Sequence, residues 1–146
     1  MIKEFSIKKS GDMSLSANFK VKEFMCNDAC DKVLIDIDLV SQLQDLRDYL
    51  GKPVTITSGY RTESYNKQCG GAENSYHLKG QAVDIYCSGV KPIVIALWAE
   101  FNGLGGIGLY LDRIQEFVHI DTRQNKYRWV NRNGSNTAIK SMTDLL

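Results

Sequence analysis

The stretch Ser75–Asp84 reads Ser-Tyr-His-Leu-Lys-Gly-Gln-Ala-Val-Asp and contains His77, one of only two histidines in the chain. Asp84 follows His77 by seven residues, inside an apolar run, and Gly80 between them permits a sharp backbone turn. The second histidine, His119, lies far downstream. Two imidazoles and a carboxylate are a donor set that catalytic zinc uses, with a fourth position open to water. These three residues are therefore candidate metal ligands, although a surface histidine beside a strand aspartate would give the same short pattern.

Further motifs surround this stretch in a fixed order: Thr57-Ser58-Gly59-Tyr60-Arg61, Tyr65-Asn66, Gly70-Gly71-Ala72, Ser75-x-His77-x-x-Gly80-x-Ala82-x-Asp84, Gly106-x-Gly108-x-Tyr110 and Phe117-Val118-His119-Ile120-Asp121. Together they resemble the zinc D-Ala-D-Ala carboxypeptidase and L-alanyl-D-glutamate endopeptidase family, which cuts the stem peptides of bacterial peptidoglycan. The resemblance runs from about Leu15 to Trp129. It implies zinc as the cofactor, a peptidoglycan peptide as the substrate, and His77, Asp84 and His119 as the zinc ligands.

Length, composition and charge indicate the class of protein and the partners that it is expected to lack. The chain has 146 residues, which suits one domain with a single core. Hydrophobic residues make up 43% and charged residues 24%, as in ordinary soluble globular proteins. The formal net charge of +1 does not indicate a nucleic-acid or membrane partner, and no apolar run approaches the length of a spanning helix. We therefore expect neither partner, and we expect a monomer.

The first residues, 1–5, are charged and lack the apolar core of a secretory leader. We therefore expect synthesis in the cytoplasm and, for a wall substrate, action on the cell wall after release or lysis. The small size favours a phage or prophage lysis enzyme (an endolysin) or one piece of a larger wall-degrading machine.

The four cysteines do not form a recognisable metal motif. Cys26 and Cys30 are separated by three residues, which is not the spacing of a usual zinc knuckle, and no second pair follows. Reduced thiols in a protein made in the cytoplasm are the simpler interpretation, and a Cys26–Cys30 disulfide is the alternative.

Apolar periodicity predicts two core helices. The first carries Leu39, Val40, Leu43, Leu46 and Leu50 at helical spacing and ends at Gly51. Either Asp36 or Asp38 can cap this helix. The second begins near Pro92 and ends at Gly103, and a short helix is expected over Glu63–Gln68.

Alternation predicts strands at 54–57 and 81–86, a hairpin of 106–111 with 116–122, and a last strand near 127–129. On the strand 81–86, Ala82 and Asp84 share one face while Val83 and Ile85 pack behind. This pattern indicates an α+β fold, an antiparallel sheet with helices packed on one side and the zinc site on the open face. We expect an N-terminal arm or loosely packed strand at 1–14, the peptidase domain at 15–130 and a tail at 131–146.

Metallopeptidase chemistry also requires a proton acceptor, because zinc activates a water molecule whose proton must be moved. Many members of the resembled family carry an acid three residues before the last histidine ligand, which here is Glu116. A regular strand puts positions 116 and 119 on opposite faces, so Glu116 as the base requires a turn or bulge. Asp121 shares a face with His119 and is the alternative base, or a partner that holds the imidazole ring.

Arg61 follows a predicted strand and turn, from which its guanidinium could reach the site. The planar guanidinium of an arginine binds a carboxylate or a developing oxyanion through two hydrogen bonds. By resemblance, Arg61 polarises the scissile carbonyl or holds a substrate carboxylate; an ordinary surface arginine is the alternative. Ser75, Tyr60, Asn66 and Tyr110 match family positions that line or brace the site, with Ser75 and Tyr110 as candidate substrate contacts.

The resemblance thus predicts a zinc metallopeptidase, either a D-Ala-D-Ala carboxypeptidase or an L-Ala-D-Glu-type endopeptidase. Two alternatives belong to other classes: a zinc-holding binding module without catalysis, as in the related hedgehog domain, and a structural component of a phage particle. An acid at position 116 argues against the first, since a bare scaffold does not need one there.

Overall fold

The computed structural model describes residues 1–146 and contains eight strands, four α-helices and three short 3-10 helices. In chain order they are β1 (Ile2–Ser6), α1 (Ile7–Ser10), η1 (Val21–Phe24), β2 (Lys32–Asp36), α2 (Ile37–Leu50), β3 (Thr55–Ser58), α3 (Glu63–Gln68), η2 (Tyr76–Lys79), β4 (Ala82–Tyr86), α4 (Pro92–Phe101), β5 (Gly106–Leu111), β6 (Glu116–Asp121), β7 (Tyr127–Arg132), β8 (Ser135–Ile139) and η3 (Met142–Leu145).

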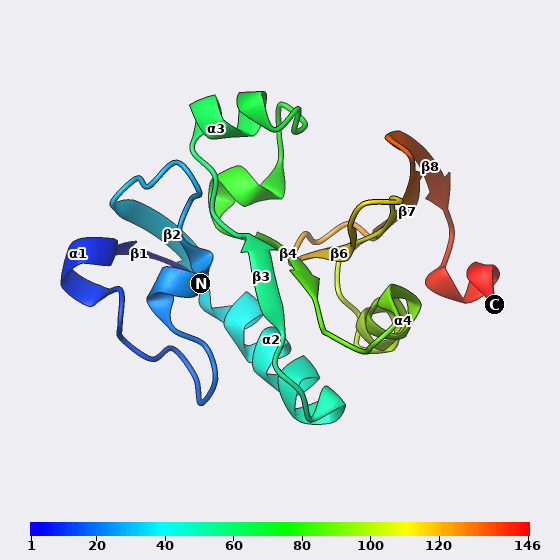
Figure 1. Cartoon of the computed structure of the whole chain (residues 1–146), viewed down its shortest axis with the longest axis horizontal. Helices are drawn as coiled ribbons and strands as arrows, with labels where there is room; N and C mark the ends of the chain where they lie inside the picture. The colour runs from blue at the N-terminus through cyan, green and yellow to red at the C-terminus, as the bar shows by residue number, and fades with distance from the viewer.

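Six strands form one sheet in the order β3-β4-β6-β5-β7-β8, and β1 pairs with β2 in a separate two-stranded sheet. Neighbours in the large sheet are antiparallel, except β5 and β7, which are parallel. Figure 1 shows α2 and α4 on one side of this sheet and α3 on the other. The predicted α+β class is confirmed, with one parallel pair that the sequence pattern did not predict.

The two core helices begin and end at residues with a clear physical role. The Asp36 carboxylate accepts a hydrogen bond from the backbone N–H of Asp38 at 3.0 Å, so Asp36 is the cap of α2. Gly51 ends α2 in the left-handed conformation with φ 64°. Pro92 occupies the first turn of α4, where its missing N–H is not needed. None of the helices combines the length and the apolar character that a membrane crossing requires.

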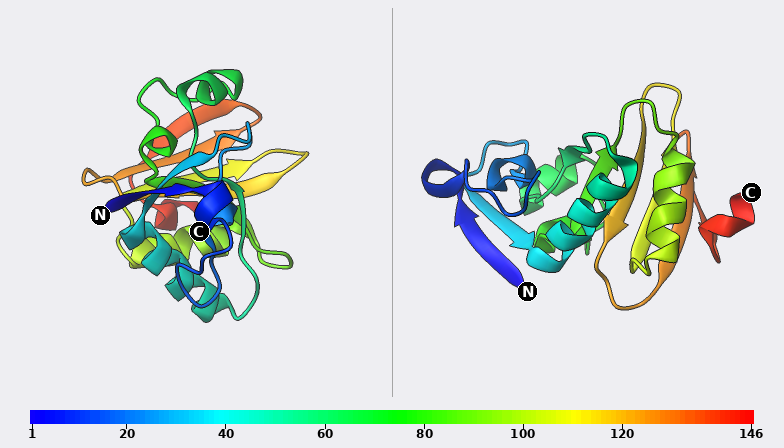
Figure 2. Two further views of the ribbon diagram at one scale, coloured as in Figure 1. Left: turned by 90° about the vertical axis from the view of Figure 1, so that its left-hand side faces the viewer. Right: turned by 90° about the horizontal axis from the view of Figure 1, so that it is seen from below.

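The main core lies between the large sheet and these two helices, which lie in front of the strands when the molecule is seen from below (Figure 2). Strands β4 and β6 contribute Val83, Ile85, Val118 and Ile120 to this core, all fully buried. Because side chains alternate along a strand, the intervening residues of β4 and β6 face the opposite side of the sheet. Three of those intervening residues are Asp84, His119 and Asp121.

Residues 131–146, predicted as a tail, are folded in the structure. Strand β7 continues to Arg132 and pairs with β8, and η3 packs its fully buried Met142 near α4. Glu100 of α4 accepts hydrogen bonds from the Met142 backbone N–H at 2.7 Å and the Ser141 hydroxyl at 2.8 Å. Polar Asn, Ser and Thr residues on an exposed edge strand gave no apolar period from which this structure could be predicted.

Met142 tests whether the C-terminal segment contributes to stability. Truncating a fully buried methionine leaves a cavity, so we expect Met142→Ala to lower the free energy of unfolding by about 2–5 kcal/mol in urea denaturation. Leu146→Ala is the matched control, since Leu146 is 85% exposed and its removal should change little. Equal unfolding midpoints for the two variants would show that η3 is not packed in solution.

Candidate metal centre

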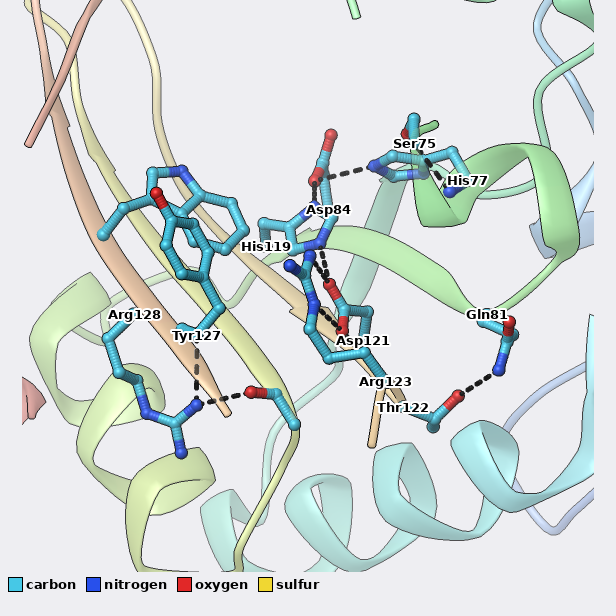
Figure 3. Close-up of polar contacts among 12 residues, drawn as sticks. Ser75, His77, Gln81, Asp84, His119, Asp121, Thr122, Arg123, Tyr127 and Arg128 are labelled. Carbon is cyan, nitrogen blue, oxygen red and sulfur yellow. Dashed lines mark hydrogen bonds and ion pairs between the residues drawn. The ribbon is translucent and has the colours of Figure 1, made fainter. Parts of the chain in front are cut away.

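The structure brings His77, Asp84 and His119 together on the face of the sheet opposite α2 and α4 (Figure 1). His77 lies on η2, Asp84 on β4, and His119 on β6 directly opposite Asp84 in the strand register. One oxygen of Asp84, Oδ1, lies 3.3 Å from His77 Nε2 and 3.1 Å from His119 Nδ1. Figure 3 shows the Asp84 carboxylate between the two imidazole rings. All three side chains are buried.

The three side chains have the chemistry and the spacing of a zinc site. One ligand atom from each lies within 4.8 Å of the others. Two ligands of a tetrahedral zinc, each about 2.1 Å from the ion, are separated by about 3.4 Å. The observed 3.1 and 3.3 Å separations from Asp84 Oδ1 are close to that value. Two imidazoles and one carboxylate are also a usual protein donor set for zinc, so these residues fit the ion.

The backbone fixes which nitrogen His77 presents. Its Nδ1–H donates to the carbonyl oxygen of Gly59 at 2.8 Å. A carbonyl can only accept, so Nδ1 carries the proton and Nε2 is free to bind a metal. The Ser75 hydroxyl accepts from the His77 backbone N–H at 3.2 Å and begins the η2 turn, which Gly80 ends with φ 72°. Ser75 therefore also has a structural task.

A carboxylate fixes His119 in the same way. Its Nε2 donates to Asp121 Oδ2 at 2.7 Å, so Nδ1 is the nitrogen that faces Asp84. Burial alone would lower the pKa of His119, but hydrogen bonds to Asp121 and Asp84 outweigh burial and raise that pKa to about 8.

Both carboxyl groups beside His119 are held as carboxylates. Burial opposes the charge on Asp84, yet the charges and hydrogen bonds of His77 and His119 keep its pKa below the usual range. Burial also opposes the charge on Asp121, and there the hydrogen bonds from Arg123 and His119 keep the pKa low. Asp84 therefore presents an anionic oxygen to the metal position at every physiological pH.

Arg61 is committed to protein acceptors on all three of its nitrogens. Its Nε donates to Ser58 Oγ at 2.9 Å, its Nη1 to Asn66 Oδ1 at 3.2 Å and its Nη2 to Asp84 Oδ2 at 3.2 Å. The Arg61 backbone N–H also donates to the His77 carbonyl oxygen at 3.1 Å. Arg61 thus braces two of the three candidate ligands, and the second proton on each Nη remains available to the cleft that it lines.

A bulge in β3 sets up this arrangement. The register of β3 against β4 shifts between Ile56 and Ser58, so that Ser58 pairs with Asp84. A bulge of this kind re-aims the side chains that follow it. Here it places the Ser58 hydroxyl against Arg61 and leads into Gly59, whose carbonyl holds His77.

Glu116 does not join the three ligands. Strand β6 pairs with β5 in unbroken register from Glu116 to Asp121, so the bulge required for Glu116 to act as the base is absent. Glu116 is exposed and lines a small apolar pocket together with core residues such as Val118 and Ile95. Regular alternation therefore keeps Glu116 on the face opposite His119.

The alternative base, Asp121, lies beside the ligands but has no exposed surface. Its oxygens accept from His119 and Arg123, and it is not among the residues that line the cleft. In this structure Asp121 contacts the metal-binding group only through the His119 ring.

The candidate ligands open into a cleft of about 690 Å³. Tyr110 lies on one wall, stacked on Phe117 with 4.3 Å between ring centroids. The Trp129 indole N–H donates to the Tyr110 hydroxyl oxygen at 3.1 Å, and the Trp129 ring lies 5.0 Å from the His119 ring. Tyr60, by contrast, is buried in the core. The cleft is lined mainly by polar, aromatic and glycine residues from η2, β4, β5, β6, β7 and β8 and from the neighbouring loops.

A sequence profile of the Peptidase M15 family matches residues 17–121. The chain belongs to this family. It is 41% identical over 95 residues to the peptidoglycan L,D-endopeptidase MepK of Escherichia coli (strain K12), an alignment that covers 60% of this chain and 51% of that protein. The chain therefore spans about half the length of that curated relative.

Two other relatives support the assignment to the M15 family. The probable peptidoglycan L,D-endopeptidase MepK of Haemophilus influenzae is 30% identical over 128 residues, covering 77% of this chain and 68% of that protein. The zinc D-Ala-D-Ala carboxypeptidase of Streptomyces albus G is 42% identical over 45 residues, covering 30% of this chain and 18% of that protein.

Two glycines of this M15 chain make room for the site. A Cβ on Gly106 would collide with the Asp121 carboxylate, and a Cβ on Gly108 would collide with the Trp129 indole. The motif Gly-x-Gly on β5 is therefore a steric requirement, since its two bare positions lie under the residues that hold and cover His119.

Arg123 is the site residue that sequence reasoning missed. Its guanidinium donates to both oxygens of Asp121 and lies over the Tyr76 ring, with Cζ 4.4 Å from the ring centroid. The strand alternation that groups His119 with Asp121 extends to position 123 and could have identified it.

The raised pKa of His119 predicts how metal binding depends on pH. Below about pH 8 a proton occupies the ring in the metal-free protein and zinc must displace it, whereas above that pH the nitrogen is free. The apparent zinc affinity should therefore rise about tenfold per pH unit and level off above about pH 8. Competition with a chelating dye, calibrated in each buffer, measures this. An affinity that does not change with pH would contradict the assignment of His119 as a ligand.

Proposed function

We propose that this chain is a zinc-dependent peptidase that hydrolyses a peptide bond in the stem peptides of bacterial peptidoglycan. The observation that carries the proposal is the convergence of His77 Nε2, His119 Nδ1 and Asp84 Oδ1 at a cleft, with the opposite nitrogen of each ring held by an acceptor. Relatives named as peptidoglycan peptidases support the substrate class.

A zinc ion held by these residues supplies a Lewis acid that polarises a carbonyl and activates water at neutral pH. The chain itself keeps the three ligands in place, because Arg61 fixes Asp84 while Gly59 and Asp121 fix the two imidazoles. Pre-set ligands do not have to reorganise during the reaction, which is the main protein contribution to catalysis of this type.

Tyr110 is the cleft residue best suited to donate to the substrate. Because its oxygen accepts from Trp129, its own O–H proton is left for another acceptor. Burial raises the pKa of Tyr110, so the hydroxyl keeps this proton at neutral pH. We assign it to the substrate carbonyl oxygen, where negative charge develops in the transition state.

Of the two candidate bonds, we propose the L,D type. The relatives with the longer alignments are both named L,D-endopeptidases, while the carboxypeptidase alignment covers 30% of this chain. Action in phage or prophage lysis is a further part of the proposal, and only the sequence supports it.

Defined muropeptides, incubated with zinc-loaded protein and read by mass spectrometry, test the function directly. We expect hydrolysis of one peptide bond type, at an L–D junction, and loss of cleavage after chelation. Cleavage at a terminal D-Ala-D-Ala bond instead would move the chain to the carboxypeptidase class. No cleavage of any muropeptide by zinc-loaded protein would favour a non-catalytic binding module or a structural component of a phage particle.

Paired variants separate the candidate roles in the same assay. Tyr110→Phe removes one donor from the cleft and should lower kcat by about 10²–10³-fold with little effect on zinc affinity. Arg61→Lys loses the planar guanidinium that connects Asp84 to Ser58 and Asn66, and should reduce both zinc affinity and turnover. Glu116→Gln is the control and should retain near-parental activity, because Glu116 lies on the other face of β6.

Loss of turnover in Glu116→Gln with zinc still bound would restore Glu116 as the base. Loss of turnover in Asp121→Asn with zinc affinity intact would instead assign the base to Asp121. Normal kinetics in Tyr110→Phe would remove Tyr110 from the mechanism.

A further inference from the structure

Arg123 lies two residues beyond the last strand residue of β6, in the connection that leads to β7. Its side chain turns back over the strand end, so that Nε donates to Asp121 Oδ1 at 2.8 Å and Nη2 donates to Asp121 Oδ2. The Arg123 backbone N–H also donates to Oδ1, at 3.1 Å. Asp121 thus receives three hydrogen bonds from one residue, and a fourth from His119 Nε2.

Aromatic rings hold the guanidinium in this position. Its Cζ lies 4.4 Å from the Tyr76 ring centroid, 5.5 Å from that of Tyr127 and 5.6 Å from that of Trp129. Tyr76 precedes the ligand His77, and Trp129 lies against the ring of His119. A cation among aromatic faces is attracted to their electron-rich surfaces, and arginine stacks on them flat. Arg123 therefore contacts the surroundings of both histidine ligands.

Two glycines lie directly against Asp121 and Arg123, and a side chain at either position would displace them. A Cβ on Gly105 would collide with the Arg123 carbonyl oxygen, and a Cβ on Gly106 would collide with the Asp121 carboxylate. The Asp121–Arg123 unit consequently rests directly on the β5 backbone. The orientation of the carboxylate is set from below by β5 and from the side by the guanidinium.

We propose that Arg123 is a positioning residue that holds Asp121 so that His119 presents Nδ1, and not Nε2, to the zinc ion. The inference rests on the proposed function only in requiring zinc at this site. Without the two-pronged contact, the Asp121 carboxylate could turn away from Nε2, and the imidazole would lose the acceptor that fixes its orientation. Tyr76, Tyr127 and Trp129 would then contribute to metal binding indirectly, by fixing Arg123.

The test compares Arg123→Met, which keeps the apolar stem, with Arg123→Lys, which keeps the charge but lacks the planar guanidinium that matches the two carboxylate oxygens. We expect Arg123→Met to weaken zinc binding by about 10–100-fold and Arg123→Lys to weaken it less. Arg128→Lys is the matched control. Arg128 also donates from two guanidinium nitrogens to one buried carboxylate, at 2.9 and 2.8 Å to Glu100 Oε2, and it does not line the cleft. That variant should lose stability and keep the parental zinc affinity.

Nitrogen-15 NMR of the zinc-loaded protein gives a readout that a merely structural role would not move. In the parent, the Nε2 proton of His119 and the Nδ1 proton of His77 should both be visible, because each is hydrogen-bonded. In Arg123→Met the His119 proton should broaden by exchange with water, while the His77 proton, held by Gly59, stays unchanged as an internal control.

Parental zinc affinity with both ring protons retained in Arg123→Met would overturn the proposal. Equal loss of both ring protons would also overturn it, since it would indicate general loosening. If Arg123→Met does not fold, Arg123→Lys decides by the same two readouts, and failure of both variants to fold would make Arg123 a residue of the fold. A parent that binds zinc but cleaves nothing would refute only the proposed function. A parent that binds no zinc would refute both.

Discussion

The carboxylate of Asp84 joins three parts of the chain: the η2 turn, strand β6 and the turn after β3. Its Oδ1 lies against His77 and His119, and its Oδ2 accepts from Arg61. A buried anion is stable only when hydrogen bonds and opposite charge replace the water that it loses. Without them, burial of the charge costs several kcal/mol. The η2 turn, strand β6 and the turn after β3 must therefore all be in place around β4 before this carboxylate can be buried. The stability of the sheet and the geometry of the site therefore depend on the same contacts.

Charge balance explains why this site suits a divalent ion. The two buried carboxylates, Asp84 and Asp121, are each paired with one arginine, Arg61 and Arg123. Imidazoles that bind zinc are neutral and add no charge, so the protein groups of the zinc-bound site would sum to about zero. The charge of a bound zinc ion would remain largely uncompensated and available to a substrate oxygen, because a bound cation dominates the local field. The arginines thus stabilise the ligand geometry and neutralise the two carboxylates, so that the metal does not have to.

Local patterns predicted most of the sheet and both core helices, because strand alternation and helical spacing act over a few residues. The three candidate ligands were predicted mainly from the resemblance to a known family. Features that depend on distant contacts were not predictable in the same way. The bulge lies at Thr57 in β3 instead of beside Glu116, and its position depends on pairing with β4. The burial of Met142 depends on Glu100, which is far away in the sequence. Arg123 could have been found, since alternation places position 123 with the ligand side of β6.

The central claim is that the two imidazoles present different nitrogens to one zinc ion, each fixed by an acceptor on its far side. A crystal structure of the zinc-loaded protein, with anomalous data collected at the zinc edge, tests this most directly. The account predicts a single zinc ion bound by His77 Nε2, Asp84 and His119 Nδ1, with Asp121 still hydrogen-bonded to His119 Nε2. Zinc bound elsewhere, or bound through His119 Nε2 with Asp121 turned away, would contradict it.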